Sequence, residues 1–167
     1  SARAWVTQKR HRMRTRELRR DPQRYARAYL DAAWYRARHP DASADAWRHY
    51  RSVGVPAGLA PNPVFDVATY RYDHPELGPQ DDPLEHWLVE GRFSGDPPHP
   101  LFDAVWYRRA HPDVGRTEPY LHYLTVGRAQ GRATSAAVDA GQDIAAARPR
   151  LPAPPAQAGD VTVTIIV

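Results

Sequence analysis

The pattern of apolar and polar positions in the middle of this chain repeats three times in tandem, with a period of about 36 residues. Each block opens with an apolar residue and an Asp, and a Tyr follows four residues after the Asp. In the third block Phe102, Val105 and Trp106 fall on one helical face, and Asp103 can cap the first turn. Pro112 then stops the helix. This half of the block therefore predicts a short amphipathic helix.

The second half of each block predicts another short helix, which is clearest in the middle copy. Asp82 can cap it, Pro83 suits a first turn that needs no N–H, and Glu85 can reach back as in a capping box. Gly91 is expected to end this helix as a left-handed C-terminal residue. The capping residues of the other two copies are Asp45 and Glu118.

The stretch between the two predicted helices differs in length among the copies, which places a surface loop there. Helices of about two turns are not stable alone, so they must pack against neighbouring copies. We predict an all-α fold with three tandem repeats, each a pair of short helices, at residues 30–64, 65–101 and 102–132. A basic helical arm at residues 1–29 is expected to precede them.

The C-terminal part of the chain changes character twice. Residues 133–160 are rich in Pro and Ala without an amphipathic period, which predicts an extended linker. Val161–Val167 is β-branched and becomes fully apolar, as a buried parallel strand does. We interpret it as the first strand of a truncated α/β domain, and the chain as a fragment of a longer protein.

The net charge of +4 is unevenly distributed. Residues 1–27 hold ten Lys or Arg against two acidic residues, so the rest of the chain is net negative. Residues 3–27 can meet an anionic membrane surface, at about 1 kcal/mol per cation, or an acidic partner. A solvated linker helix is the favoured interpretation of this segment, ahead of these partners. Nucleic acid is disfavoured because aromatics do not alternate with the cations as stacking requires.

Cysteine is absent, which excludes disulfides and thiolate metal sites and fits a reducing compartment. No apolar run approaches the roughly 20 residues that span a bilayer, and no signal-peptide pattern is present. The expected location is the cytoplasm, with the inner face of the membrane as a peripheral site.

Histidine and aspartate recur in register in all three copies. The two histidine classes of a copy lie ten to twelve residues apart without a fixed partner, so a structural role, such as bonding a helix-end carbonyl, is favoured over metal binding. The aspartates Asp31, Asp66 and Asp103 are interpreted as helix caps. No catalytic, cofactor-binding or metal-binding residue is predicted in this fragment. The six recurring histidines are His39, His74, His111, His49, His86 and His122.

Aromatic side chains leave two alternatives open. They can form the core between repeats, or they can stack on the rings of a glycan acceptor. Full burial of Trp34 and Trp106 would remove the glycan platform. The aromatics on the predicted helices are Trp34, Tyr35, Trp47, Tyr70, Trp87, Trp106, Tyr107 and Tyr123.

The motifs Phe-Asp-x-x-x-Tyr, His-Pro-Asp and Pro-Leu-x-His-Trp-Leu, with the Gly-Arg pairs that follow, resemble tandem helical repeats of bacterial glycosyltransferases. Those enzymes synthesise surface polysaccharides of the O-antigen and rhamnan type. Val161–Val167 resembles the first strand of a family 2 (GT-A) glycosyltransferase domain.

The resemblance implies a non-catalytic region that acts as a spacer, docking or acceptor-binding array. The nucleotide-sugar donor and the divalent metal of the enzyme would belong to the missing domain, beyond Val167. A repeat scaffold that binds protein or envelope partners, with no enzyme attached, is the alternative. A nucleic-acid module is a third, which rests only on the N-terminal charge.

Overall fold

The computed structural model describes residues 17–144, and within that range the secondary structure is entirely helical. The all-α prediction is confirmed for this part of the chain. The strand predicted at 161–167 lies outside the described residues, as do residues 1–16 of the basic arm and 145–160 of the predicted linker.

The first predicted helix of each sequence copy is present and spans seven residues. In every copy the predicted Asp caps it, accepting a hydrogen bond from a first-turn amide. Each ends at a His that precedes a Pro. These helices are α3 (Ala32–Arg38), α5 (Val67–Asp73) and α8 (Ala104–Ala110).

The second helix of each copy begins as an α-helix and widens into a π-helix that ends at a glycine. The predicted caps Asp45, Asp82 and Glu118 all accept first-turn amides. The α-helical parts are α4 (Ala46–His49), α6 (Pro83–His86) and α9 (Pro119–His122). The π-helical parts are η3 (Tyr50–Gly54), η4 (Trp87–Gly91) and η6 (Tyr123–Gly127), and α7 (Arg92–Ser94) extends η4.

The predicted left-handed end at Gly91 is wrong. Gly91 has a φ of −54° and lies inside a continuing helix, which ends instead at Gly95 with a φ of +91°. Gly91 is needed for space, because a Cβ built on it would lie 2.4 Å from Tyr70 Oη. The equivalent glycines of the other copies, Gly54 and Gly127, are crowded by a tyrosine in the same way.

The predicted capping box of the middle copy is replaced by a contact between copies. Glu85 binds the guanidinium of Arg51, which also donates to Asp82 at 2.8 Å. Burial raises the pKa of Glu85 to about 6, against the opposing effect of Arg51. Tyr50 from the first copy donates to Asp82 at 2.8 Å. The cap of α6 therefore also joins the first two copies.

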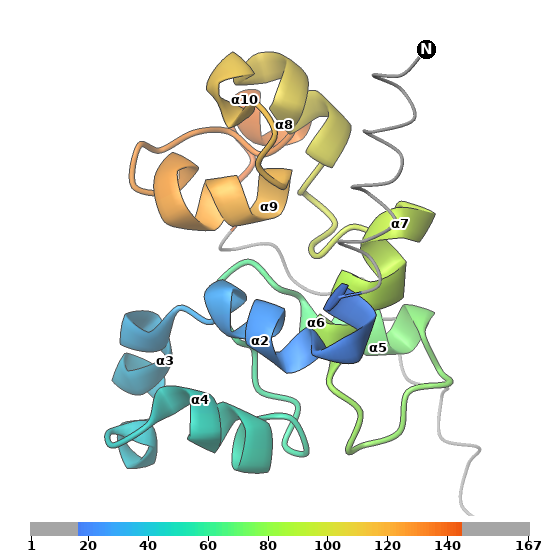
Figure 1. Cartoon of the computed structure of the whole chain (residues 1–167). Coiled ribbons are helices and arrows are strands. Elements are labelled where there is room, and N and C mark those ends of the chain that lie inside the picture. The colour runs from blue at the N-terminus through green and yellow to red at the C-terminus, as the bar shows by residue number, and fades with distance from the viewer. Residues whose placement is uncertain (1–16, 145–167) are drawn as a thin grey trace, which may run out of the picture.

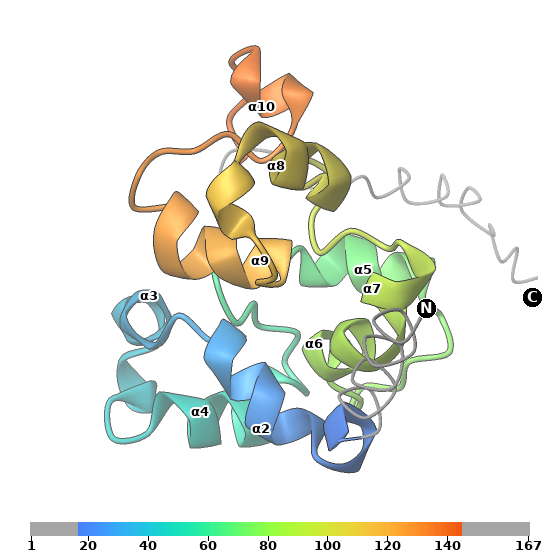
Figure 2. The same cartoon turned by 45° about the horizontal axis from the view of Figure 1, so that its top comes forward.

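The helix over Pro22–Ala26 lies between the helices of the first and middle copies (Figures 1 and 2). This N-terminal segment shares one aromatic core with the middle and third copies, to which the first copy adds Val64, whereas Tyr35 and Tyr50 of the first copy belong to a second hydrophobic cluster. Tyr29 stacks on Tyr120, and both rings contact Trp87 edge-on. Asn62 is fully buried, accepts from the Tyr120 hydroxyl and donates to the Tyr29 carbonyl. Since the third copy contacts the end of the first, the helices form three lobes around a centre rather than an open stack (Figure 2).

The chain leading into this core is also helical. Residues 17–20 are helical, followed by α2 (Pro22–Ala26) and η1 (Arg27–Tyr29). Ala26 and Tyr29 are buried in the shared core. Two further 3-10 turns, η2 (Pro40–Ala42) and η5 (Pro112–Val114), follow the first helices of the outer copies. No helix within residues 17–144 is long and apolar enough to cross a bilayer.

Residues 134–144, assigned above to a linker, are folded onto the third copy. The Thr134 carbonyl accepts the Asp103 amide at 3.0 Å, as Pro98 does for Asp66 in the middle copy. Ser135 caps α10 (Ala136–Asp139), and Ile144 enters the shared core. Thr134, Ser135 and Ile144 are buried, and Thr134 Oγ1 donates to the Leu101 carbonyl at 2.8 Å, so isolated contacts rather than an amphipathic helix fix the segment.

Candidate functional site

A tyrosine on the first helix of each copy contacts a histidine on the second. The Tyr Oη to His Nδ1 distances are 3.0, 2.8 and 3.1 Å in chain order. The helical spacing from the Asp cap turns the tyrosine inward, and the glycine on the second helix leaves room for its hydroxyl. The pairs are Tyr35 with His49, Tyr70 with His86 and Tyr107 with His122.

The other ring nitrogen of each histidine faces the acid of the His-Pro-Asp or His-Pro-Glu motif. His49 Nε2 lies 2.9 Å from Asp41, His86 Nε2 lies 3.8 Å from Glu76, and His122 Nε2 lies 3.5 Å from Asp113. A carboxylate only accepts, so Nε2 carries the proton and Nδ1 accepts from the tyrosine. Each copy therefore contains the same Tyr-His-carboxylate cluster.

These clusters join the helices of a copy and are poorly placed for nucleophilic chemistry. Tyr35 and Tyr107 are fully buried, so no substrate atom can reach their hydroxyls. Burial, with a smaller effect of Asp41, raises the pKa of Tyr35 to about 12, which keeps the phenol neutral. Of the recurring histidines, His111 meets the predicted kind of partner, a backbone carbonyl, at Ala133.

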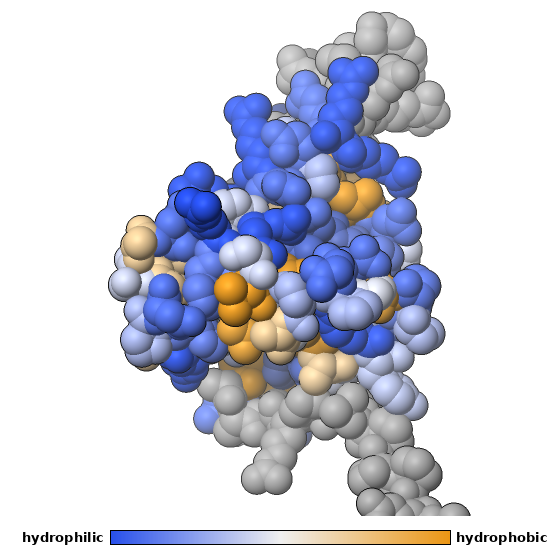
Figure 3. Space-filling view, turned by 90° about the horizontal axis from the view of Figure 1, so that it is seen from below, coloured by the Kyte–Doolittle hydropathy of each residue, from blue (hydrophilic) through white to orange (hydrophobic). Residues whose placement is uncertain are grey.

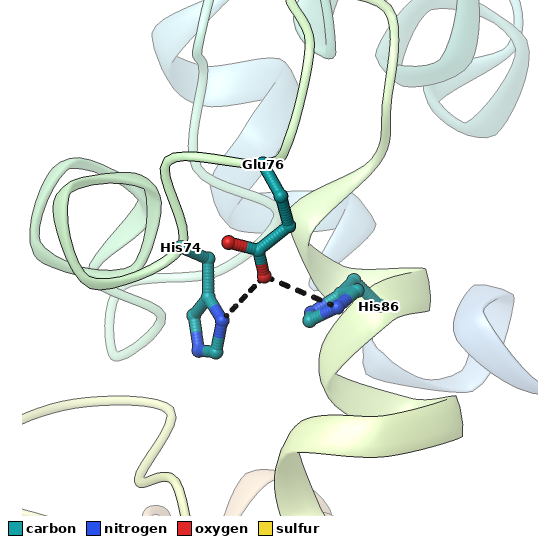
Figure 4. Close-up of side chains that lie close together, drawn as sticks. All are labelled: His74, Glu76 and His86. Atoms are coloured by element: carbon teal, nitrogen blue, oxygen red, sulfur yellow. Dashed lines mark hydrogen bonds and ion pairs between the residues drawn. The ribbon is translucent and has the colours of Figure 1, made fainter.

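The middle copy adds a second histidine to its cluster (Figure 4). His74 Nδ1 lies 3.0 Å from the Glu76 oxygen that also faces His86, and His74 Nε2 lies 3.5 Å from Asp96 Oδ2. Glu90, one turn after His86, lies 3.8 Å from His86 Nε2. Three carboxylates therefore surround two imidazoles.

The third copy places a cation where the middle copy has an acid. Arg132 follows the second glycine of its copy, as Asp96 does in the middle copy, and donates to both oxygens of Asp113 at 2.7 and 2.9 Å. This fork lowers the pKa of Asp113. In the third copy, the carboxylate of the Tyr-His-carboxylate cluster is therefore neutralised by an ion pair with Arg132.

A cleft of about 790 Å³ separates α7 from α8, in the size range of ligand-binding pockets. Its walls include Pro97 and Pro98, the exposed Val105, and the guanidinium groups of Arg109 and Arg116. Its three acidic residues have partners: Asp103 caps α8, Glu118 caps α9 and accepts from Tyr29, and Asp96 lies 3.5 Å from His74 Nε2.

The cations of the cleft are less committed than its acids. Arg108 donates to the carbonyls of Gly115 and Thr117, whereas Arg109 and Arg116 have no ion-pair partner among residues 17–144. The Nε of Arg92 is buried without a hydrogen-bond partner in the same range. The cleft therefore suits an anionic ligand with an apolar face.

The predicted aromatic platform is largely internal. Tyr35, Tyr70, Tyr107, Trp87 and Tyr123 are buried. Trp34, Trp47 and Trp106 are partly buried, and Arg38 covers the Trp34 ring at 4.3 Å. The face shown in Figure 3 is mostly hydrophilic, with a small apolar patch near its centre and separate apolar spots toward its edges. Most of these rings therefore serve the core, and the three partly buried tryptophans pack against the two hydrophobic clusters.

Sequence reasoning missed both the Tyr-His-carboxylate clusters and the cleft. The acid stands two residues after the first histidine in every copy, and this constant spacing was an available signal for the clusters. The cleft had no such signal, because Arg109 and Arg116 belong to one copy only.

No family model matches the chain, and no curated protein sequence and no solved structure shows significant similarity to it. The arguments that follow therefore rest on the geometry and chemistry of its own residues.

Proposed function

We propose that the chain is an array of three helix-pair repeats that serves as the non-catalytic, acceptor-binding region of a bacterial surface-polysaccharide glycosyltransferase. One observation carries the proposal: the recurring Tyr, His and Asp side chains are bonded to each other inside the copies, whereas unpaired guanidinium groups line an open cleft. That division favours binding over catalysis.

The chemistry of the cleft favours an acidic glycan. Carboxylate or phosphate groups on a sugar would bind Arg109 and Arg116 by charge-assisted hydrogen bonds, each contributing about 1.5–3 kcal/mol when desolvated. The apolar face of a pyranose ring would pack on Val105 and the Pro97-Pro98 wall. A neutral glycan would make only the apolar packing contact and not the charge-assisted hydrogen bonds.

The catalytic domain in this proposal begins with the strand pattern Val161–Val167 and brings the nucleotide-sugar donor and a divalent metal. The helical array would hold the growing polysaccharide beside this catalytic domain in the cytoplasm. The cations of residues 3–27 would rest on the anionic inner face of the membrane; within the described part, Arg19, Arg20 and Arg24 are exposed.

Calorimetric titration of the full chain with an oligogalacturonate tests the cleft, with an uncharged oligosaccharide of equal length as the ligand control. Arg109→Ala combined with Arg116→Ala is expected to weaken oligogalacturonate binding at least tenfold, because two charge-assisted contacts are lost. Arg36→Ala is the matched control: Arg36 is an exposed cation on α3, outside the cleft. Equal effects of the two variants would contradict the proposal.

The enzyme and scaffold alternatives are separated by the coding sequence after Val167. A GT-A domain with an Asp-x-Asp motif supports the glycosyltransferase, and another helical repeat in that place supports a scaffold. Sedimentation with vesicles containing anionic lipid, against vesicles of neutral lipid alone, tests the arm; equal sedimentation would exclude the membrane contact.

A further inference from the structure

We propose that the middle copy binds one divalent transition-metal ion, of the zinc class, through His74, Glu76 and His86. One ligand atom from each residue lies within 4.8 Å of the other two, and this is the one such group within residues 17–144. Two imidazoles and one carboxylate form a ligand set that suits zinc. These three residues do not line the glycan cleft, although Asp96, the outer partner of His74, does.

The distances fit a metal after small side-chain movements. Glu76 Oε1 lies 3.0 Å from His74 Nδ1 and 3.8 Å from His86 Nε2 (Figure 4). Ligand atoms on a tetrahedron with bonds of about 2.0 Å are separated by roughly 3.3 Å, between these two values. Glu76 can adjust because its side chain is 59 % exposed on a loop.

Both imidazoles already have the outer partners that orient a metal-bound histidine. With Nε2 on the metal, His86 Nδ1–H donates to Tyr70 Oη, at 2.8 Å. With Nδ1 on the metal, His74 Nε2–H points to Asp96 Oδ2, at 3.5 Å. Such partners fix the ring tautomer and orientation and strengthen the ligand. The coordinating nitrogens are thus assigned by the contacts around them.

The local charge also distinguishes the middle copy. Glu90 occupies the position of Val53 in the first copy and Val126 in the third. Asp96 occupies the position of Leu59 and Arg132. Acids therefore stand at both positions in the middle copy alone, and they favour a dication there.

The other copies carry two histidines and an aspartate at the equivalent positions but do not form the site. In the third copy, Arg132 holds both oxygens of Asp113, and His111 Nε2 lies 3.1 Å from a carbonyl. In the first copy the two imidazole centroids, of His39 and His49, are 6.3 Å apart, against 4.9 Å in the middle copy. The third copy therefore offers a matched internal control.

Titration of the full chain with Zn²⁺ by calorimetry tests the proposal. The wild-type chain is expected to show a high-affinity step of one ion per chain. Glu76→Gln keeps the size of an exposed side chain but removes its charge, and is expected to weaken this step at least tenfold. Asp113→Asn, the equivalent change in the third copy, is expected to leave it within twofold.

A second variant, outside the three ligands, tests the site independently of Glu76→Gln. Circular dichroism checks that each variant keeps its helices. Asp96→Asn removes the outer partner of His74 and is expected to weaken Zn²⁺ binding several-fold. The absence of the one-ion step in the wild type would overturn the site. An affinity unchanged by Glu76→Gln, or lowered equally by Asp113→Asn, would also overturn it.

Discussion

The middle and third copies place the same Tyr, His and acid on the same helical framework but neutralise the acid differently. Glu76 faces two imidazoles and has further acids nearby, whereas Asp113 is held by the guanidinium of Arg132. The residue after the second glycine, Asp96 or Arg132, is one source of this difference, and Glu90, which replaces Val126 of the third copy, is another. A shared structural cluster is therefore an ion pair in one copy and a candidate metal site in the other.

The largest expected effect on stability comes from substituting the crowded glycine that the two copies share. Gly127→Ala would place a Cβ 2.0 Å from Tyr107 Oη, and Gly91→Ala would place one 2.4 Å from Tyr70 Oη. Each is expected to lower the free energy of unfolding by about 3 kcal/mol through overpacking. Urea unfolding measures the loss.

Gly131→Ala is the control for that substitution. Its φ of +64° makes alanine strained, but no atom lies within 4 Å of the new Cβ, so a loss of about 1 kcal/mol is expected. Adding Tyr107→Phe to Gly127→Ala should restore part of the stability by removing the hydroxyl. Equal losses for Gly127→Ala and Gly131→Ala would contradict the steric explanation.

The next effect measures how much each Tyr-His bond contributes. Tyr107→Phe leaves the nitrogen of a histidine with an 8 % exposed side chain without a donor and is expected to cost about 1–2 kcal/mol. Tyr70→Phe should cost less, about 0.5–1 kcal/mol, because water reaches the 19 % exposed side chain of His86 more easily. Urea unfolding in metal-free buffer compares them, and the reverse order would contradict this account.

Exchanging Asp96 for the equivalent residue of the third copy should change metal binding with little change in stability. Asp96→Arg introduces the guanidinium of the third copy beside Glu76 and is expected to abolish the one-ion Zn²⁺ step. The free energy of unfolding without metal should change by no more than about 0.5–1 kcal/mol, as for exposed ion pairs. An Asp96→Arg chain that still binds Zn²⁺ with wild-type affinity would show that this position does not distinguish the copies.

The smallest effect is the pH dependence of the ion pair in the third copy. The pKa of Asp113 is lowered first by its hydrogen bond to Arg132, so its contribution to stability is complete above its ordinary value of 3.8. That contribution is lost as the pH falls through the lowered pKa, when the folded carboxylate takes up a proton. An NMR titration of the Asp113 carboxyl carbon in Arg132→Ala should show its pKa rising toward 3.8; an unchanged pKa would contradict the assigned cause.

Local signals in the sequence were reliable at the helix starts. Asp31, Asp66 and Asp103 were predicted as caps and are caps, because capping depends on amides only two or three residues away. The same local reasoning failed at Gly91, where the glycine makes room for a tyrosine 21 residues earlier in the chain. A glycine required for space and a glycine required for a left-handed turn look the same in a sequence.

The candidate sites were less predictable than the helices. The recurring histidines were expected to lack a fixed partner, but each second-helix histidine faces the acid eight to ten residues before it. Loops of different length in the copies hid this regularity. The cleft between α7 and α8 required the packing of two copies, and its free guanidiniums belong to only one of them.

The sequence by itself determined where most helices begin and that three similar units follow one another, because caps and prolines act within one turn. Only the tertiary structure decided that the copies close on one another, with one core joining the N-terminal helices to the middle and third copies. That closure depends on contacts such as Tyr120 with Asn62 and Arg128 with Asp31, which are 58 and 97 residues apart. The tertiary structure likewise decided which histidines share an acid, because the order of residues does not fix the distance between two loops.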